Sequence, residues 1–354
     1  MSLIFSSLTS TAARRFAAQG ISSWKPVFTG HRYFSNTAVL SSATPVKLHT
    51  EWVPPEASSN DNQYSILFLH GLLGNGRNLK TFARKLVKQQ SSNDGSCGGG
   101  ILMDLRGHGS SFQRTATEND EASTFQDCAR DVHHTLEDFH VTETVPLTSV
   151  LVGHSFGGRV ALEYAASLVD SGNPMIDSQN NLKALWLLDT VPGEANESVD
   201  KVLAIITNVL EERKKNQNAN ELTKKDMVQV LTNPPHNMDL PTAQWLAMSY
   251  DEQYGDNFGF DNDFVTRLKP EFATQDFLGQ LRHILESNNV KDEPTMVHMV
   301  RGGANKGWTI PILSALEGLK KEFPLAFHLH VLPSAGHNVH IDDLPGLLKF
   351  FSGR

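Results

Sequence analysis

The sequence predicts an α/β fold built on a mostly parallel, doubly wound sheet with helices on both faces. Short apolar strand-like runs alternate with amphipathic helical runs along most of the chain. A serine between two glycines follows one of these strands directly and precedes a helix. About a hundred residues before the last two strands show helical periodicity alone. This stretch predicts a helical lid inserted into the sheet-forming part of the chain.

Strand-like and helical runs succeed one another from residue 41 onward. The run over 64–70 is almost continuously apolar, as a strand covered on both faces requires, and it ends at Gly71. The pattern then predicts a helix over 78–89, a strand over 100–104 entered from a glycine-rich loop at 95–100, a helix over 125–139, a strand over 149–152, a helix over 158–169 and a strand over 182–188. It resumes with a strand over 295–300, a helix over 312–322, a strand over 327–332 and a closing helix from Leu344. The predicted core therefore comprises residues 41–191 and 291–354.

The predicted lid occupies residues 192–290. Val202, Ile206 and Leu210 recur at helical spacing within it, and Met227 marks another helix. Since this stretch has no strand set of its own, we expect a lid that rests on the sheet rather than a separate domain.

Composition restricts the class of protein. The chain has 354 residues, of which 39% are hydrophobic and 20% charged, which suits a folded core and excludes collagen, coiled coil and global disorder. No apolar run approaches the ~18 residues of a membrane-spanning helix. A net charge of −8 disfavours a nucleic-acid surface over the whole protein. Two cysteines, Cys97 and Cys128, form no disulfide framework and suit a reducing compartment, and Cys128 is expected to be a small core residue.

The first fifty residues differ in charge from the rest of the chain. They hold five bases and no acid, whereas the remainder holds 26 bases and 39 acids. They are also rich in Ser and Thr and include the pair Arg14-Arg15, which is typical of an organelle transit peptide. Residues 32–35 resemble a mitochondrial processing site with cleavage after Phe34. We expect residues 1–40 to be a transit peptide that directs the protein to the mitochondrial matrix, with a plastid or an ordinary disordered tail as alternatives.

A G-x-S-x-G segment at residues 153–157 carries the predicted chemistry. Its position after an apolar strand and before a helix gives the match its meaning, because a sharp turn there presents Ser155 at the carboxyl edge of the sheet. The flanking glycines remove side chains that would collide in the turn. Ser155 is therefore predicted to be a nucleophile.

A serine hydroxyl needs an adjacent base to become nucleophilic. The best candidate is His337, in the loop after the last strand, and His340 is its nearest competitor. The chain order serine, acid, histidine agrees with this choice.

Two backbone amides should stabilise the oxyanion of a tetrahedral intermediate. We expect one from Phe156, directly after the nucleophile, and one from Leu72 in the loop His70-Gly71-Leu72-Leu73-Gly74. This loop lacks the glycine spacing of a phosphate cradle. His70, Gly71 and His154 flank these groups and are expected to bind substrate.

Four motifs together resemble the α/β-hydrolases: the strand ending in HGLLG, the loop DLRGHGS at 104–110, the elbow GHSFGG and the closing AGHNVH. The resemblance covers roughly residues 60–354 and is greatest to the small serine esterase branch that includes mitochondrial abhydrolase-domain protein eleven and yeast ethanol acetyltransferase. It implies the α/β-hydrolase fold, cleavage of a small-molecule ester or thioester or acyl transfer to an alcohol, and no metal or organic cofactor.

The acid of the triad departs from the commonest pattern of that superfamily. The loop after the predicted strand 295–300 offers Asn305 but no carboxylate, and an amide could orient an imidazole without stabilising its charge. Asp189 ends the strand that should lie beside the nucleophile strand, and some relatives resemble it in placing the acid there. Asp189 is therefore the predicted acid, with Asp256 of the lid as the alternative.

Other polar groups receive structural interpretations. Asp104 and Arg106 are expected to fix their loop by hydrogen bonds beside the site. The pairs His133/His134 and His328/His330 lack a third ligand at metal spacing and are interpreted as surface or packing residues, so no metal site is predicted. C–C bond hydrolysis, hydroxynitrile cleavage, perhydrolysis and a non-hydrolysing ligand receptor remain alternative functions of such a scaffold.

Overall fold

The computed structural model describes residues 44–56, 63–112, 124–143, 145–170, 182–194, 197–215, 222–251, 257–288 and 294–352. All of them belong to one of the two units of the chain, which runs from Tyr33 to Arg354. The expected transit peptide at residues 1–40 and the alternative acid Asp256 lie outside the described residues.

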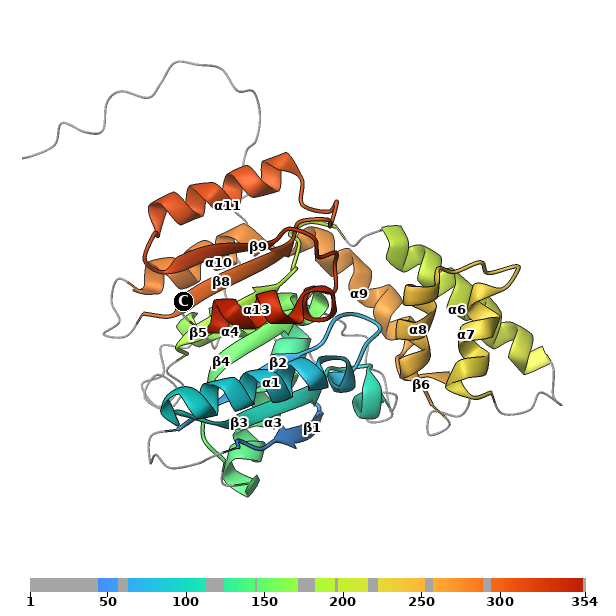
Figure 1. Ribbon diagram of the computed structural model, residues 1–354, viewed down its shortest axis with the longest axis horizontal. Coiled ribbons are helices and arrows are strands. Elements are labelled where there is room, and N and C mark those ends of the chain that lie inside the picture. The colour runs from blue at the N-terminus through green and yellow to red at the C-terminus, as the bar shows by residue number, and fades with distance from the viewer. Residues whose placement is uncertain are drawn as a thin grey trace, which may run out of the picture. The chain divides into compact units, whose positions relative to one another are not determined.

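A seven-stranded sheet forms the centre of this unit (Figure 1). Its strand order is β1-β3-β2-β4-β5-β8-β9, and only β1 pairs in the antiparallel sense. The strands are β1 (His49–Val53), β2 (Tyr64–Leu69), β3 (Cys97–Asp104), β4 (Thr148–His154), β5 (Ala184–Leu188), β8 (Met296–Gly302) and β9 (Phe327–Leu332). The mostly parallel sheet predicted from the alternation is confirmed. Because the six parallel strands run in one direction, the loops after them gather at one edge.

Two features of the sheet were not predicted. Strand β1 is an edge strand whose first four residues, among them Thr50 and Glu51, are half-buried, and it lacks the continuous apolar run that marks the inner strands. Gly98 and Gly99 were expected to lie in the loop before the strand over 100–104 but belong to β3, which begins at Cys97. They make room for large neighbours, since a side chain at Gly99 would collide with the Trp52 indole.

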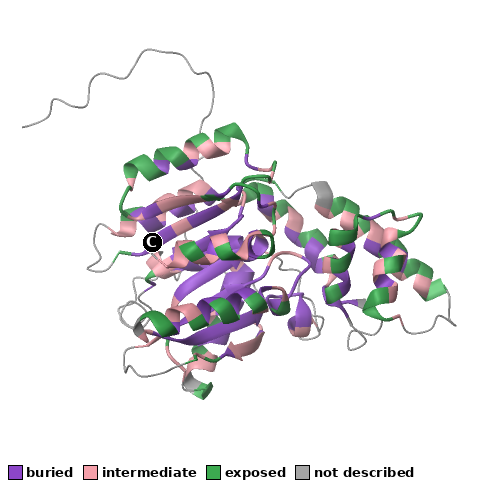
Figure 2. Cartoon of the chain, in the orientation of Figure 1, coloured by how far each residue is buried: buried purple, intermediate pink, exposed green. Residues whose placement is uncertain are grey.

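Helices cover both faces of the sheet (Figure 1). One face packs against α1 (Gly76–Asp94) and α13 (Leu344–Phe351), beside the short α12 (Val339–Asp342). The other packs against α3 (Phe125–Glu143), α4 (Phe156–Asp170), α10 (Phe277–Ser287) and α11 (Ile310–Glu322). Figure 2 shows the inner strands buried between these layers, with exposed residues on the outer sides of the helices and in the loops. This is the doubly wound arrangement that the sequence predicted.

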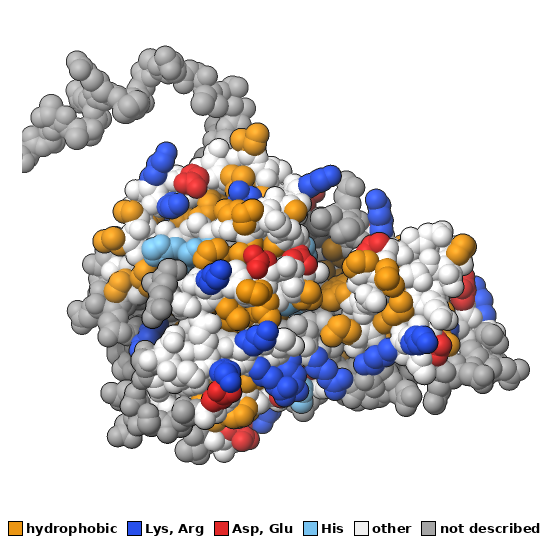
Figure 3. All heavy atoms as spheres, viewed as in Figure 1, with side chains coloured by type: hydrophobic (Ala, Val, Ile, Leu, Met, Phe, Trp, Pro, Cys, Tyr) orange, Lys and Arg blue, Asp and Glu red, His pale blue; other side chains and the backbone are white. Residues whose placement is uncertain are grey.

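The histidines of β8 and β9 form a stack on the face covered by α13. The His298 ring lies 3.9 Å from the Trp186 ring of β5 and 4.9 Å from the His328 ring, in nearly parallel orientation. His298 Nδ1 and His330 Nε2 are 3.1 Å apart. Figure 3 shows histidine side chains reaching the surface in this part of the molecule. The interpretation of His328 and His330 as packing residues agrees with this arrangement.

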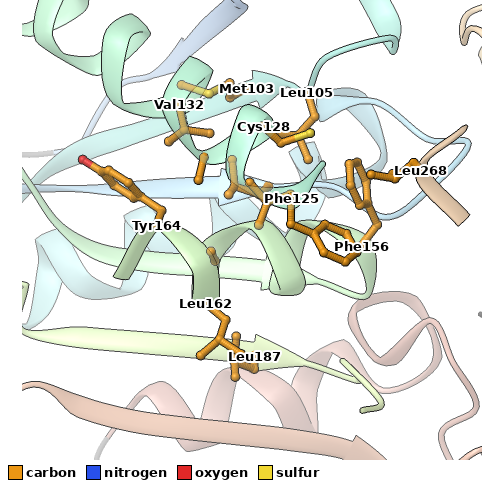
Figure 4. Packing of buried hydrophobic residues seen from close by; sticks show 14 of the residues in the cluster. Met103, Leu105, Phe125, Cys128, Val132, Phe156, Leu162, Tyr164, Leu187 and Leu268 are labelled. Carbon is orange, nitrogen blue, oxygen red and sulfur yellow. The ribbon is translucent and has the colours of Figure 1, made fainter. Parts of the chain in front are cut away.

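The larger core cluster lies between the sheet and the helices α3 and α4 (Figure 4). Phe125 and Cys128 of α3 pack there with Phe156 and Leu162 of α4 and with Leu187 of β5. All five side chains are fully buried, so the expectation that Cys128 is a small core residue is confirmed. The start of α4, which follows the predicted nucleophile, is thereby fixed from beneath.

The stretch expected to be a lid contains α6 (Glu197–Lys215), α7 (Lys224–Thr232), α8 (Leu240–Ser249) and α9 (Asn262–Thr274). It also contains two strands of two residues each, β6 (Tyr250–Asp251) and β7 (Asn257–Phe258), which the sequence did not predict. Helix α10 packs against α4 and therefore contributes to the covering layer of the sheet. Among the described residues, no helix combines the length and the apolar character needed to cross a bilayer.

Arg159 of α4 connects both ends of this stretch. Its guanidinium donates to the carbonyls of Val191 and Gly193 at the beginning, at 2.5 Å each, and to the carbonyl of Phe272 near the end, at 3.1 Å. The group is almost fully buried, and burial lowers its pKa to about 10. A cation at neutral pH therefore joins the inserted helices to α4, the helix that follows Ser155.

Candidate active site

Ser155 occupies a sharp turn between β4 and α4. Its φ of 51° lies in the left-handed region, which is uncommon for a residue with a side chain and costs roughly 1–2 kcal/mol. Two glycines permit the turn: a side chain at Gly157 would collide with the carbonyl of Leu69, and one at Gly153 with the carbonyl of Gly157. The Ser155 amide donates to the Leu188 carbonyl of β5 at 3.0 Å. The half-buried serine is thus presented at the carboxyl edge of the sheet.

Asp189 directly follows the end of β5, as Ser155 directly follows the end of the neighbouring strand β4. In the register of the sheet His154 pairs with Leu188, and Leu188 pairs with Val300 of β8, so the residues after these strand ends are neighbours. Asp189 also has a positive φ of 43°, and its side chain has no exposed surface. A second strained residue therefore stands beside the first.

The buried carboxylate of Asp189 accepts four hydrogen bonds. Its Oδ1 accepts from the Gly302 amide at 2.7 Å and from Trp308 Nε1 at 2.6 Å. Its Oδ2 accepts from Asn305 Nδ2 and from His337 Nδ1, the latter at 2.7 Å. Four donors, three from the segment 302–308 and one from the loop after β9, compensate for the removal of this charge from water.

The loop 301–308 supplies donors to Asp189 rather than an acid. Asn305 was considered as a neutral orienter of the imidazole, but its amide contacts the Asp189 carboxylate instead. The involvement of Trp308 was missed. Its only signal in the sequence is a tryptophan in a glycine-rich loop. The structure buries its indole, and a buried N–H requires a hydrogen-bond partner.

His337 lies in the loop after β9 and faces both Asp189 and solvent. Its side chain is 48% exposed, whereas that of Asp189 is fully buried. Because Nδ1 donates to the carboxylate, Nε2 carries the lone pair of the neutral ring. An imidazole in this state has an accessible nitrogen that can accept a proton.

The segments that carry Ser155 and His337 meet at His154. Among the described residues, the Ser155 hydroxyl has no hydrogen-bond partner, and catalytic hydrogen bonds often tighten only when substrate binds. The link between the two segments passes through His154, whose Nε2 lies 2.9 Å from the His337 carbonyl oxygen. The competitor His340 is buried and packs its ring against that of His154 at 4.7 Å.

The loop after β2 lies next to the nucleophile. Gly71 approaches Ser155 so closely that a side chain there would come within 3.6 Å of the Ser155 Cβ. Leu72 is half-buried in a turn closed by the Gly74 amide on the Gly71 carbonyl at 3.1 Å, and Leu73 has a φ of 63°. The Phe156 amide opens α4 and therefore has no acceptor within the helix. Both predicted oxyanion donors are thus located at the edge where Ser155 emerges.

Two buried histidines, His70 and His108, hold the loop after β2 by hydrogen bonds. The expectation that His70 binds substrate is wrong. His70 was expected to bind substrate, but its side chain is completely buried, with Nε2 accepting from the Leu105 amide at 2.9 Å and Nδ1 2.8 Å from the Gly71 carbonyl. Burial lowers the pKa of His70 to about 4. The neutral ring therefore orients the loop and has no nitrogen left for a substrate.

His108 fulfils the same function from the neighbouring loop. Its Nε2 accepts from the Leu73 amide at 3.2 Å, and burial together with the nearby His70 lowers its pKa to about 3. Asp104 and Arg106 fix this loop as expected: the Asp104 carboxylate accepts the Gly76 amide, and Arg106 forms a buried ion pair with Asp131. Within the described part of the chain, no group of histidine, cysteine and acidic residues has the arrangement of a metal site.

Sequence comparison finds relatives with limited coverage. A segment of 128 residues is 28% identical to the "sn-1-specific diacylglycerol lipase ABHD11" of Danio rerio, over 36% of this chain and 34% of that protein. A segment of 101 residues is 30% identical to a "Putative esterase/lipase" of Haemophilus influenzae, over 28% of this chain and 29% of that protein. The matches thus span about a third of the length of these relatives.

Solved structures share the fold over much more of the chain. A "Marine microorganism esterase" superimposes with a TM-score of 0.59 at 16% identity, covering 87% of this chain and 99% of that one. A "Thioesterase Domain From Curacin Biosynthetic Pathway" gives a TM-score of 0.52 at 17% identity, covering 87% and 99%. The model of the alpha/beta hydrolase family matches residues 66–345, which run from within β2 through the inserted helices to the start of α13. The chain therefore belongs to the alpha/beta hydrolase family.

Proposed function

We propose that this protein is a serine hydrolase that cleaves carboxylic esters or thioesters through an acyl-enzyme on Ser155. The observation that carries the proposal is the 2.7 Å hydrogen bond between the buried Asp189 carboxylate and His337 Nδ1, beside a serine in a strained left-handed turn. A buried acid, a half-exposed imidazole and a serine at the end of a strand are the parts that acyl transfer requires.

In the acylation step the Ser155 hydroxyl attacks the substrate carbonyl carbon. His337 Nε2 accepts the hydroxyl proton as the C–O bond forms, and the resulting imidazolium is stabilised by the Asp189 carboxylate on Nδ1. The tetrahedral intermediate then collapses. The bond to the leaving group breaks, and His337 returns its proton to the departing alkoxide or thiolate, which leaves as the alcohol or thiol.

The negative charge of the intermediate requires donors that are already in place. The amides of Leu72 and Phe156 are the proposed pair, because one lies in the loop held by His70 and His108 and the other begins α4. The positive end of the α4 dipole adds to their effect. Loss of one such donor typically costs on the order of 10²–10³ in kcat.

Deacylation repeats these steps with water. His337 removes a proton from water, whose oxygen attacks the acyl carbonyl, and the same two amides hold the second oxyanion. Collapse releases the carboxylic acid, and the proton on His337 returns to Ser155. The names of the similar proteins, among them a diacylglycerol lipase, an esterase and a thioesterase domain, support oxygen or sulfur esters as the substrate class.

The proposal is tested by treating the purified protein with a fluorophosphonate probe and analysing it by mass spectrometry. One adduct per chain on Ser155, together with turnover of a p-nitrophenyl or thiol ester, is expected. Ser155→Ala should lose both, whereas the matched control Ser149→Ala on the same strand should keep both. If the folded protein takes up no probe, or takes up one equivalent without turning over any ester, a ligand-binding role replaces the hydrolase.

We also propose that residues 1–40 direct the protein into mitochondria. The support is the acid-free composition of the first fifty residues, which include the pair Arg14-Arg15. Import of the full chain into isolated mitochondria, with loss of its leader, is expected. Replacement of both arginines by glutamine should reduce import, and equal import of the two forms would contradict the proposal.

A further inference from the structure

We propose that His154 is a positioning residue, which fixes the general base by donating a hydrogen bond to the main chain of His337. The inference rests on the proposed function, in which His337 is the base. His154 was expected to bind substrate because it precedes the nucleophile. Its side chain instead points to the loop of the base, 183 residues further along the chain.

The geometry of this contact joins two catalytic segments. His154 Nε2 lies 2.9 Å from the carbonyl oxygen of His337, and the two rings are 4.9 Å apart. Because a carbonyl only accepts, Nε2 must carry the proton. His154 is the last residue of β4, so the same short segment fixes Ser155 on one side and the backbone of His337 on the other.

Neighbouring groups leave the His154 ring little freedom to move. Its Nδ1 would lie 2.8 Å from a Cβ at Gly71, so the glycine is what leaves room for the imidazole. The His340 ring packs on another side at a centroid distance of 4.7 Å and an interplanar angle of 67°. The His154 side chain is 5% exposed. A ring confined in this way holds its N–H in one direction.

The neutral state of His154 is maintained by its surroundings. Burial, together with the nearby His340 and His337, lowers the pKa of His154 well below its usual value. The ring therefore keeps one proton, on Nε2, and leaves Nδ1 unprotonated. A charged ring here would oppose the imidazolium that His337 forms during the reaction.

This second anchor is needed because His337 is not fixed by burial. Its side chain is 48% exposed, and Asp189 restrains only the ring at Nδ1. A carbonyl held by His154 defines the position of the backbone from which the ring extends. A displacement of the base by about 1 Å can cost on the order of 10² in rate.

The test compares variants that keep or remove the N–H at this position. His154→Gln retains a donor near the position of Nε2, whereas His154→Leu fills the space without one. We expect the leucine variant to lower kcat for a p-nitrophenyl ester by about 10- to 100-fold with KM changed less than about 3-fold. The glutamine variant should recover most of this loss. Fluorophosphonate labelling should reach one equivalent in both, but more slowly in the leucine variant.

His298→Leu is the matched control, since it removes a largely buried neutral ring of the same sheet that, within the described residues, has no ring contact or hydrogen bond with His154 or His337. It should keep kcat within about 3-fold of wild type. If His154→Leu does not fold, His154→Asn replaces it, because the shorter amide cannot reach the carbonyl. Equal losses in the donor-keeping and donor-free variants, or a change in melting temperature alone, would overturn the inference. Failure of the wild type to react with the probe would instead reject the proposed hydrolase function.

Discussion

Asp189 and His337 lie 148 positions apart in the sequence, and their side chains meet in a 2.7 Å hydrogen bond between Oδ2 and Nδ1. The acid stands after β5, directly beside the nucleophile strand β4, and the loop after β8 contributes hydrogen-bond donors to it. The carboxylate is thus held by donors from the loops after β8 and β9, which fix its orientation beside His337.

Asp189→Asn should lower kcat by about 10³-fold or more, because an amide cannot stabilise the imidazolium and places an N–H against the proton on His337 Nδ1. KM should change little. The measurement is steady-state ester hydrolysis at pH 7.5, with circular dichroism to verify folding. Asp263→Asn, an exposed aspartate in α9, is the control and should keep wild-type kinetics. Retention of most of kcat by Asp189→Asn would remove it from the triad.

Trp308→Phe should lower kcat by about 3- to 30-fold while the fold is retained. The substitution keeps an aromatic ring in a buried position but removes the Nε1–H that donates to Asp189 Oδ1 at 2.6 Å. A carboxylate that loses one of four donors is less well fixed, and a hydrogen bond to a charged group contributes about 1.5–3 kcal/mol. Trp245→Phe in α8 serves as the control for a tryptophan without this contact. Equal kinetics of the two variants would show that the indole N–H has no part in orienting Asp189.

Sequence reasoning predicted the parts of the site that depend on local pattern. The turn at Ser155 follows from a strand, two glycines and a helix that are adjacent in the chain, and the order of the strands was enough to suggest Asp189. Trp308 could not be found in this way, because its contact with Asp189 depends on how the loop after β8 folds back over the end of β5. The same holds for His154, because only the folded sheet brings the loop after β9 and its His337 carbonyl next to the end of β4.

Errors in the predicted fold have equally local causes. Strand β1 was missed because it opens with three polar residues and has no continuous apolar run. Gly98 and Gly99 of β3 were assigned to a loop because nothing in the sequence shows that the Trp52 indole packs against Gly99. Strands β6 and β7, at two residues each, are too short to produce any periodicity. In all three cases the strand is defined by pairing or packing with residues outside the segment itself.

Stability should fall as the pH decreases below about 6.5, since several histidines are buried in the neutral state. Burial lowers the pKa to about 3 or 4 in five histidines: His70, His108, His298, His330 and His340. Nearby histidines or a lysine add to this effect at all of them except His70. Each such group binds a proton in the unfolded chain near pH 6.5 but not in the folded one. Its contribution to stability is therefore complete above pH 6.5 and is lost as the pH falls toward the lowered value. Between pH 7.5 and 5.5 each of the well-buried His70, His108, His298 and His340 should cost about 1.4 kcal/mol of the free energy of unfolding, whereas the more exposed His330 should cost less.

His298→Phe isolates one of these contributions. A phenyl ring can retain the stacking on Trp186 but does not titrate, so the variant should lose about 1.4 kcal/mol less than wild type between the two pH values. Urea denaturation at pH 7.5 and 5.5 measures the difference. His134→Gln on the exposed side of α3 should show the same pH dependence as wild type. An identical pH dependence of His298→Phe and wild type would mean that His298 titrates in the folded protein as it does in the unfolded chain.

Arg159→Met should destabilise the protein and loosen the inserted helices. The buried guanidinium donates to the carbonyls of Val191 and Gly193 before α6 and to that of Phe272 in α9, and methionine would leave these buried acceptors without a donor. Hydrogen bonds to a charged group contribute about 1.5–3 kcal/mol each, and their effects are not additive, so a loss of about 2–4 kcal/mol in the free energy of unfolding is expected. Because methionine fills a similar space beside the ring of Phe272, the variant removes the hydrogen bonds of Arg159 and keeps most of its packing.

Limited proteolysis with chymotrypsin distinguishes local loosening from general destabilisation in this variant. In Arg159→Met, cleavage within residues 192–274 should become faster at low urea, while sites in the sheet remain protected, because the tie between the inserted helices and α4 is broken before the core unfolds. Lys225→Met, an exposed cation on α7, is the matched control and should be cleaved at the wild-type rate. A variant that unfolds in a single step, with uniform protection up to its midpoint, would show that Arg159 stabilises the whole domain and does not hold the inserted helices in particular.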